Sequence, residues 1–123
     1  MTTRTKTAVL SFGICMSLAL SASAAQSPPP GTVQTGVASF YNAPSAKSAP
    51  GYLSMAHRHW ALGTNVVVTN LKNRQSVCVA VTDRGPYRKG RIADLSITAA
   101  KRIGLTHNHG LTRVKLEVVE ACP

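Results

Sequence analysis

Acidic residues are scarce in this 123-residue chain, which has 4 Asp and Glu against 14 Lys and Arg. None of the four precedes Asp83, which excludes carboxylate chemistry from the first two thirds of the sequence. Long apolar runs are also missing, because the run over residues 8–20 is too short to span a bilayer with its flanks. No internal repeat is present, which excludes a repeat architecture.

The first 24 residues are predicted to be a signal peptide. They combine a positive start at Arg4 and Lys6 with the apolar run and with small residues at 22–24 (ASA), as at a cleavage site. The remaining 99 residues are enough for one compact domain. We therefore expect an exported monomer in the periplasm, outside the cell or at the cell wall, without a transmembrane segment after processing.

The predicted mature chain keeps 12 of the 14 basic residues. A secreted domain this basic is expected to favour the anionic surfaces of a cell envelope, with no specific nucleic-acid partner. A basic surface that only aids solubility is the alternative.

Cys78 and Cys122 are the two cysteines that remain after the leader. An even number in an exported chain suggests a disulfide. This disulfide would close a loop of about 45 residues and stabilise the fold by about 4 kcal/mol in the chain-entropy account. Two buried free thiols are the alternative.

Short strands dominate the rest of the chain. Residues 25–35 are Pro-rich and predict an extended linker, and the folded domain is expected over residues 36–123. Strands are predicted over residues 36–41, 65–70, 77–82, 92–95 and 112–119, while residues 52–60 fit either a strand or a helical turn. Ser96 is expected to cap a short helix that Gly104 ends. This pattern indicates a mainly β fold, a small barrel with one short helix.

The strand over residues 77–82 is the centre of the pattern. Neither of its alternate sets carries a charge, which predicts a strand buried on both faces. Gly85 and Pro86 then end it, so Asp83 is expected at a strand end on the rim of the core. Acid chemistry and a structural turn are both open for this carboxylate.

Several short motifs follow one another in a recognisable order: ASFY at 38–41, AHR at 56–58, LGT at 62–64, VVVTN at 66–70, VTDRGP at 81–86, GRIADLS at 90–96 and VKLEV at 114–118. In this order they resemble the double-psi β-barrel of rare lipoprotein A-like proteins, which are relatives of expansins and barwin-type domains. The resemblance covers residue 36 to about residue 119. It implies a six-stranded double-psi barrel with a groove for polysaccharide.

The resemblance also implies an activity. Similar proteins are lytic transglycosylases, which cut peptidoglycan glycan strands between N-acetylmuramic acid and N-acetylglucosamine, leave a 1,6-anhydro end and need no metal or organic cofactor. The Asp of their DRGP motif is catalytic, and it corresponds to Asp83. Their second carboxylate is an upstream Glu, and Tyr52 stands in its place here. One acid suffices in principle, because the sugar's own 6-hydroxyl is the nucleophile, whereas a hydrolase needs two.

Further residues are expected at the substrate. By the same resemblance, His57 of the AHR motif lines the groove. The basic residues after Asp83, Arg84 and Arg91 among them, are expected either to hold carboxylates of peptidoglycan or to be solvated. The other candidates for substrate binding are Tyr41, Tyr87 and Asp94, with ordinary barrel packing the alternative for the aromatics and an N-terminal helix contact or an Arg pair for Asp94.

The four histidines form two H-x-H pairs, His57/His59 and His107/His109. This spacing suits a metal on a strand, but no third ligand type accompanies it, and no metal site is predicted. The predicted function is therefore cleavage of glycan strands. A non-catalytic, expansin-like wall-binding module is the first alternative, and a barwin-like or inhibitor-type binding protein is the second.

Overall fold

The computed structural model describes residues 26–41, 52–106 and 110–123. Among them no helix has the length and hydrophobicity to cross a bilayer. The predicted signal peptide, the loop at 42–51 and the pair His107/His109 lie outside the described residues. The elements are β1 (Val33–Phe40), β2 (Ser54–Ala56), β3 (Asn65–Asn70), β4 (Ser76–Asp83), β5 (Arg91–Leu95), α1 (Ile97–Arg102) and β6 (Thr112–Val119).

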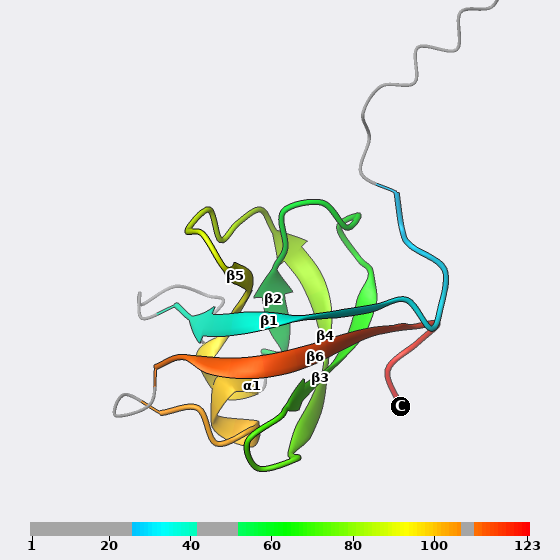
Figure 1. The fold of residues 1–123 in the computed structure, drawn as a ribbon. Helices are drawn as coiled ribbons and strands as arrows, with labels where there is room; N and C mark the ends of the chain where they lie inside the picture. The colour runs from blue at the N-terminus through cyan, green and yellow to red at the C-terminus, as the bar shows by residue number, and fades with distance from the viewer. Residues whose placement is uncertain (1–25, 42–51, 107–109) are drawn as a thin grey trace, which may run out of the picture.

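The six strands close into a barrel in the order β1-β5-β2-β4-β3-β6, with α1 beside it (Figure 1). The pairs β1–β5 and β2–β4 are parallel, and the other pairs are antiparallel. Figure 1 shows β1 and β6 side by side where the barrel closes. Closure pairs the backbone groups that an open sheet leaves at its edges. The predicted mainly β, six-stranded barrel with one short helix is confirmed.

Alternation along the strands builds the core. Every second residue of β3, β4 and β6 points inward and is at most 6 % exposed: Val66, Val68, Val77, Val79, Val81, Val114, Leu116 and Val118. Buried Ala99, Ala100 and Ile103 bring α1 onto the same core. The Ser96 hydroxyl caps α1 by accepting the Ala99 N–H at 3.4 Å, and it donates to the Tyr52 carbonyl at 2.7 Å. Gly104 follows the helix with a φ of 76°.

The central strand differs from the prediction on one face. Val77, Val79 and Val81 lie in the core, but Cys78, Ala80 and Thr82 are only half-buried. The prediction of burial on both faces is therefore wrong, because β4 lines a closed barrel whose outer side has little cover. Part of that cover is the disulfide from Cys78 to Cys122, which confirms the predicted bond.

The first strand begins earlier than alternation predicts, at Val33 instead of Gly36. The reason is its partner: the β6 backbone continues the ladder, and Gly31 N–H donates to Val118 O at 2.8 Å while Val118 N–H donates to Thr32 O at 2.9 Å. The last three residues of the expected linker thus belong to β1. The open choice over residues 52–60 resolves into the short strand β2 followed by a turn.

Candidate active site

Asp83 lies at the end of β4 on the outer side of the barrel, and a β-bulge puts it there. Met55 of β2 pairs with Val81, but the next residue, Ala56, pairs with Asp83, so Thr82 is the extra residue. Strict alternation from the buried Val81 would direct residue 83 into the core. The Thr82 hydroxyl instead donates to Asp83 Oδ2 at 3.0 Å, which places both side chains on one side.

A second carboxylate lies on the other side of β2. Asp94 of β5 pairs with Ala56, so Asp83 and Asp94 flank the same residue with their Cα atoms about 10 Å apart, two strand spacings. Ser39 of β1 donates to Asp94 Oδ1 at 2.9 Å. Burial raises the pKa of Asp94 above its usual value, against the opposing effects of this hydrogen bond and of the Arg91 charge.

His57 follows β2 directly and is buried, with 3 % of the residue exposed. Its Nδ1 accepts the backbone N–H groups of His59 at 3.1 Å and Trp60 at 3.0 Å. This pattern assigns the ring proton to Nε2, which donates to Gln34 Oε1 at 2.7 Å. The His57 ring also stacks on Trp60 with the centroids 4.2 Å apart. Both nitrogens are therefore occupied within the protein.

His57 is joined to the carboxylate region through the backbone, because its N–H donates to the Asp83 carbonyl at 3.0 Å. Burial lowers the pKa of His57 to about 4, with smaller contributions from the charges of His59, Arg84 and Arg58. The ring is thus neutral at neutral pH, and its geometry suits positioning of the strand end better than direct contact with a sugar.

The arginines at this end of the barrel bind backbone carbonyls. Arg84 Nη1 donates to the carbonyls of His57 at 3.1 Å and Trp60 at 2.6 Å, and Arg58 Nη2 donates to the Arg91 carbonyl at 3.0 Å. Arg84 was expected at the substrate, and the structure gives its guanidinium a role in fixing the turn after β2. The positive charge of Arg91 lies close enough to Asp94 to lower the pKa of its carboxyl group, against the larger, opposite effect of burial.

The two predicted aromatic contacts differ in exposure. Tyr41 follows β1 and is half-buried, with its hydroxyl 3.4 Å from Ser54 Oγ on β2. Tyr87 lies beyond the Gly-Pro turn and is 75 % exposed. Trp60 is partly buried and packs against the core. The structure therefore brings together Asp83, Asp94, His57, Arg84 and Arg91, with Tyr41 beside β2 and Tyr87 open to solvent.

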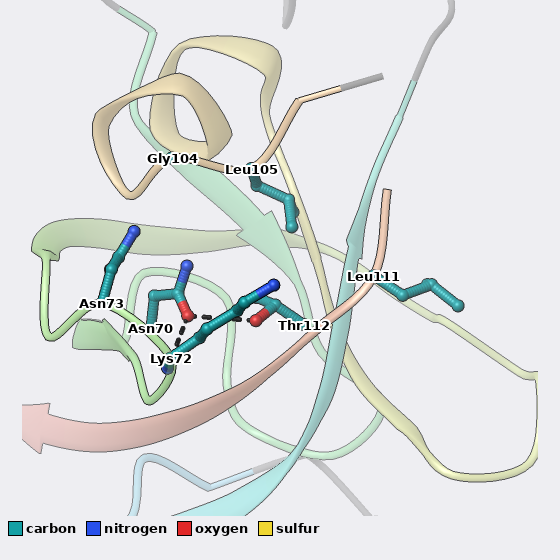
Figure 2. A pocket seen from close by; sticks show the side chains of 7 residues that line it. All are labelled: Asn70, Lys72, Asn73, Gly104, Leu105, Leu111 and Thr112. Atoms are coloured by element: carbon teal, nitrogen blue, oxygen red, sulfur yellow. Dashed lines mark hydrogen bonds between the residues drawn. The ribbon is translucent and has the colours of Figure 1, made fainter. Parts of the chain in front are cut away.

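No three His, Cys, Asp or Glu side chains within residues 26–41, 52–106 and 110–123 are grouped to hold a metal. A cavity of about 210 Å³ lies at this end of the barrel, lined by Gln34, His57, Arg58, His59 and Ile92. Another, of about 390 Å³, lies at the opposite end of β4 and is lined by Asn70, Lys72, Asn73, Gly104, Leu105, Leu111 and Thr112 (Figure 2).

Three contributors were missed in the sequence. Gln34 falls in the expected linker, Ser39 belongs to the ASFY motif, and Thr82 belongs to the predicted central strand, so none of the three is predicted as a site residue. Strand alternation could have placed Ser39 on the outer face with Asp94. Nothing in the sequence marks the bulge that makes Thr82 the neighbour of the Asp83 carboxylate.

The closed six-stranded barrel with one short helix is the architecture that the resemblance implies, a double-psi β-barrel. Residues 33–116 match the lytic transglycolase family, and the chain belongs to that family. The fold and the family thereby confirm the resemblance found in the sequence.

The relatives carry a consistent name. The chain is 50 % identical over 68 residues to the probable endolytic peptidoglycan transglycosylase RlpA of Synechocystis. This alignment covers 55 % of this chain and 21 % of the relative. It is 40 % identical over 98 residues to the endolytic peptidoglycan transglycosylase RlpA of Pasteurella multocida. This second alignment covers 73 % of this chain and 33 % of the relative. The chain thus spans at most about a third of these two relatives.

Solved structures share the fold at lower identity. The apo expansin of Clavibacter michiganensis superposes with a TM-score of 0.60 at 20 % identity, over 75 % of this chain and 52 % of the expansin. A mutant of that expansin was solved in complex with cellohexaose. A Streptomyces papain inhibitor superposes with a TM-score of 0.57 at 20 % identity, over 75 % of this chain and 98 % of the inhibitor.

Proposed function

We propose that this chain is an exported lytic transglycosylase that cleaves the glycan strands of peptidoglycan between N-acetylmuramic acid and N-acetylglucosamine. The observation that carries the proposal is the pair of carboxylates, Asp83 and Asp94, on either side of Ala56. The names of the relatives support the reaction. The disulfide supports an oxidising location outside the cytoplasm, in the periplasm or at the wall.

In the proposed reaction Asp83 is the acid and then the base. Its carboxyl proton passes to the glycosidic oxygen as the C1–O bond breaks, which leaves an oxocarbenium-like sugar. The 6-hydroxyl of the same sugar attacks C1 and returns its proton to the Asp83 carboxylate, so the 1,6-anhydro ring forms without water or a cofactor. Asp94 takes the place of the missing upstream Glu and stabilises the positive charge on the sugar.

The other residues hold this pair in place. The Thr82 hydroxyl orients Asp83, and Ser39 orients Asp94. His57 and Arg84 fix the turn after β2, which carries Ala56 between the two carboxylates. Tyr41 and the exposed Tyr87 are proposed to contact sugar rings, because an aromatic face suits the apolar face of a sugar.

The second candidate is a non-catalytic wall-binding module. The absence of any Asp or Glu before Asp83 favours it, and so does the shared fold with an expansin. This candidate predicts binding to the wall polymer without new chain ends. The two functions therefore differ in their products and agree on the ligand.

The test is digestion of purified sacculi by the mature domain, with 1,6-anhydro products measured by mass spectrometry. We expect Asp83→Asn to lower the rate by about a thousandfold and Asp94→Asn by about ten- to a hundredfold. Glu120→Gln is the matched control, because Glu120 is exposed and follows β6. Full activity of Asp83→Asn would refute the mechanism, and sacculus binding without products from the wild type would establish the second candidate.

A further inference from the structure

Positive charge gathers on the side of the barrel that holds α1 and the β3–β4 connection. Five exposed basic side chains belong to this group, which we call the α1-side cluster: Lys72, Arg74, Lys101, Arg102 and Arg113. The segments that supply them, residues 70–75, 101–106 and 110–115, contain no Asp or Glu. Figure 1 shows α1 and the β3–β4 connection on the side away from the arrowhead of β4, where Asp83 lies. The cluster therefore stands apart from the proposed reaction.

Hydrogen bonds hold the three segments of the cluster against one another. The Ile103 carbonyl, directly after α1, accepts from Asn70 Nδ2 at 2.7 Å and from Asn73 Nδ2 at 3.0 Å. The Leu71 N–H donates to the Arg113 carbonyl at 2.9 Å. The five charges therefore lie on one side of the barrel, although they come from distant parts of the sequence. A surface with several cations and no carboxylate attracts anions.

Apolar groups are open on the same side. Leu111 is 52 % exposed, and Figure 2 shows its side chain pointing away from Asn70 and Thr112. A cavity of about 210 Å³ lies between the end of β1 and α1. Its lining among the described residues is mostly apolar: Phe40, Ile97, Ala100, Lys101, Leu105 and Thr106. Leu105 also lines the larger cavity of Figure 2, so the two hollows are neighbours.

The combination of cations with exposed apolar groups favours one kind of anionic partner. A soluble polyanion needs only the positive charges, and Leu111 adds nothing to its binding. An anionic bilayer attracts the cations to its headgroups and also takes up apolar side chains beneath them. We propose that the α1-side cluster docks the domain on an anionic phospholipid membrane, with Leu111 inserted between the lipids.

This docking leaves the Asp83 end of the barrel free. Ser76 begins β4 beside the cluster and Asp83 ends it, and the eight residues of the strand span about 20 Å. A membrane at the cluster therefore leaves Asp83 directed away from the lipids. If the proposed function holds, the carboxylate then faces the wall polymer. Binding to the lipid itself does not depend on that reaction.

The test is sedimentation of the mature domain with vesicles, either of phosphatidylcholine alone or of equal parts phosphatidylcholine and phosphatidylglycerol. We expect binding to the anionic vesicles only, and weaker binding as the salt concentration rises. Lys101→Gln with Arg102→Gln should weaken it about twentyfold, because each cation near an anionic surface contributes about fivefold. Leu111→Ser should weaken it about fivefold. The matched control is Arg88→Gln with Lys89→Gln, which removes the same two exposed charges from the connection between β4 and β5 and should stay within about twofold.

Equal losses for the two double variants would overturn the proposal, since binding would then follow net charge alone. Full affinity of Leu111→Ser, with displacement of the vesicles by soluble polyphosphate, would also overturn it and define a polyanion site. Binding to neither kind of vesicle, or equally to both, would do the same. If the helix variant does not fold, Lys72→Gln with Arg113→Gln makes the same test from the other two segments. The outcome is independent of the sacculus digestion, because the vesicles contain no glycan.

Discussion

The buried His57 makes the stability of the barrel depend on pH in a defined window. The pKa of His57 is about 4 in the folded chain against 6.5 for an ordinary histidine. As the pH falls below 6.5, the unfolded chain binds this proton while the folded chain does not, so stability falls down to about pH 4 and no further. The full difference corresponds to about 3 kcal/mol.

The experiment is urea unfolding of the wild type and of His57→Gln, followed by far-ultraviolet circular dichroism at several pH values from 7.5 to 4.5. We expect the wild type to lose about 2.5 kcal/mol more than the variant over this range. The raised pKa of Asp94 acts in the opposite direction, since its folded form binds the proton first. That contribution is common to both proteins and cancels in the difference.

His59→Gln is the control, because the His59 side chain is exposed and its charge is a smaller cause of the His57 pKa than burial. Its unfolding free energy should follow the wild-type pH dependence closely. Identical slopes for the wild type and His57→Gln would refute the reasoning. The ring would then be either solvated or already protonated in the folded chain.

Two other contacts give predictions. Replacing Cys78 and Cys122 by Ser removes a cross-link between residues 44 apart in sequence and should lower the free energy of unfolding by about 4 kcal/mol. The measurement is urea unfolding of the variant and of the oxidised wild type. A change below about 1 kcal/mol would contradict the chain-entropy account of this disulfide. Arg84→Gln removes the hydrogen bonds to the His57 and Trp60 carbonyls and should lower the free energy of unfolding by about 1 to 2 kcal/mol in the same assay. Arg88 is exposed, so Arg88→Gln should change this free energy little. Equal losses for the two variants would contradict the role given to Arg84.

The sequence predicts those elements whose pattern is local. The bounds of β3 and β6 agree with the structure to the residue, because β3 is a β-branched run between two Asn residues and β6 alternates apolar and polar residues. The Ser96 cap and Gly104 predict α1 for the same reason, since each acts on its own turn of backbone. The start of β1 at Val33 could not be predicted, because it depends on hydrogen bonds to β6, some 80 residues further along the chain.

The site follows the same division. Asp83 and Asp94 stand out in the sequence, but their common neighbour Ala56 appears only when β4 and β5 are seen to flank β2. The order of the strands in the barrel is a property of the whole chain. The side-chain partners of His57 and Arg84 likewise depend on which loops meet at the end of the barrel. The residue types therefore indicate the kind of chemistry, and the register between strands distant in sequence decides which of these side chains lie together in one site.

The one-residue mismatch at Thr82 has a consequence for how this domain can vary. Deleting that residue would return β4 to the phase of β2 and place Asp83 directly after the inward Val81, so alternation alone would still hold its carboxylate on the outer side. The deletion would remove the Thr82 hydroxyl, which donates to Asp83 Oδ2. Lengthening the connection over residues 84–90 leaves the phase untouched. Engineered variants should thus accept changes of length after the strand, and deletion of Thr82 should preserve the fold while it removes the hydroxyl that orients the Asp83 carboxylate.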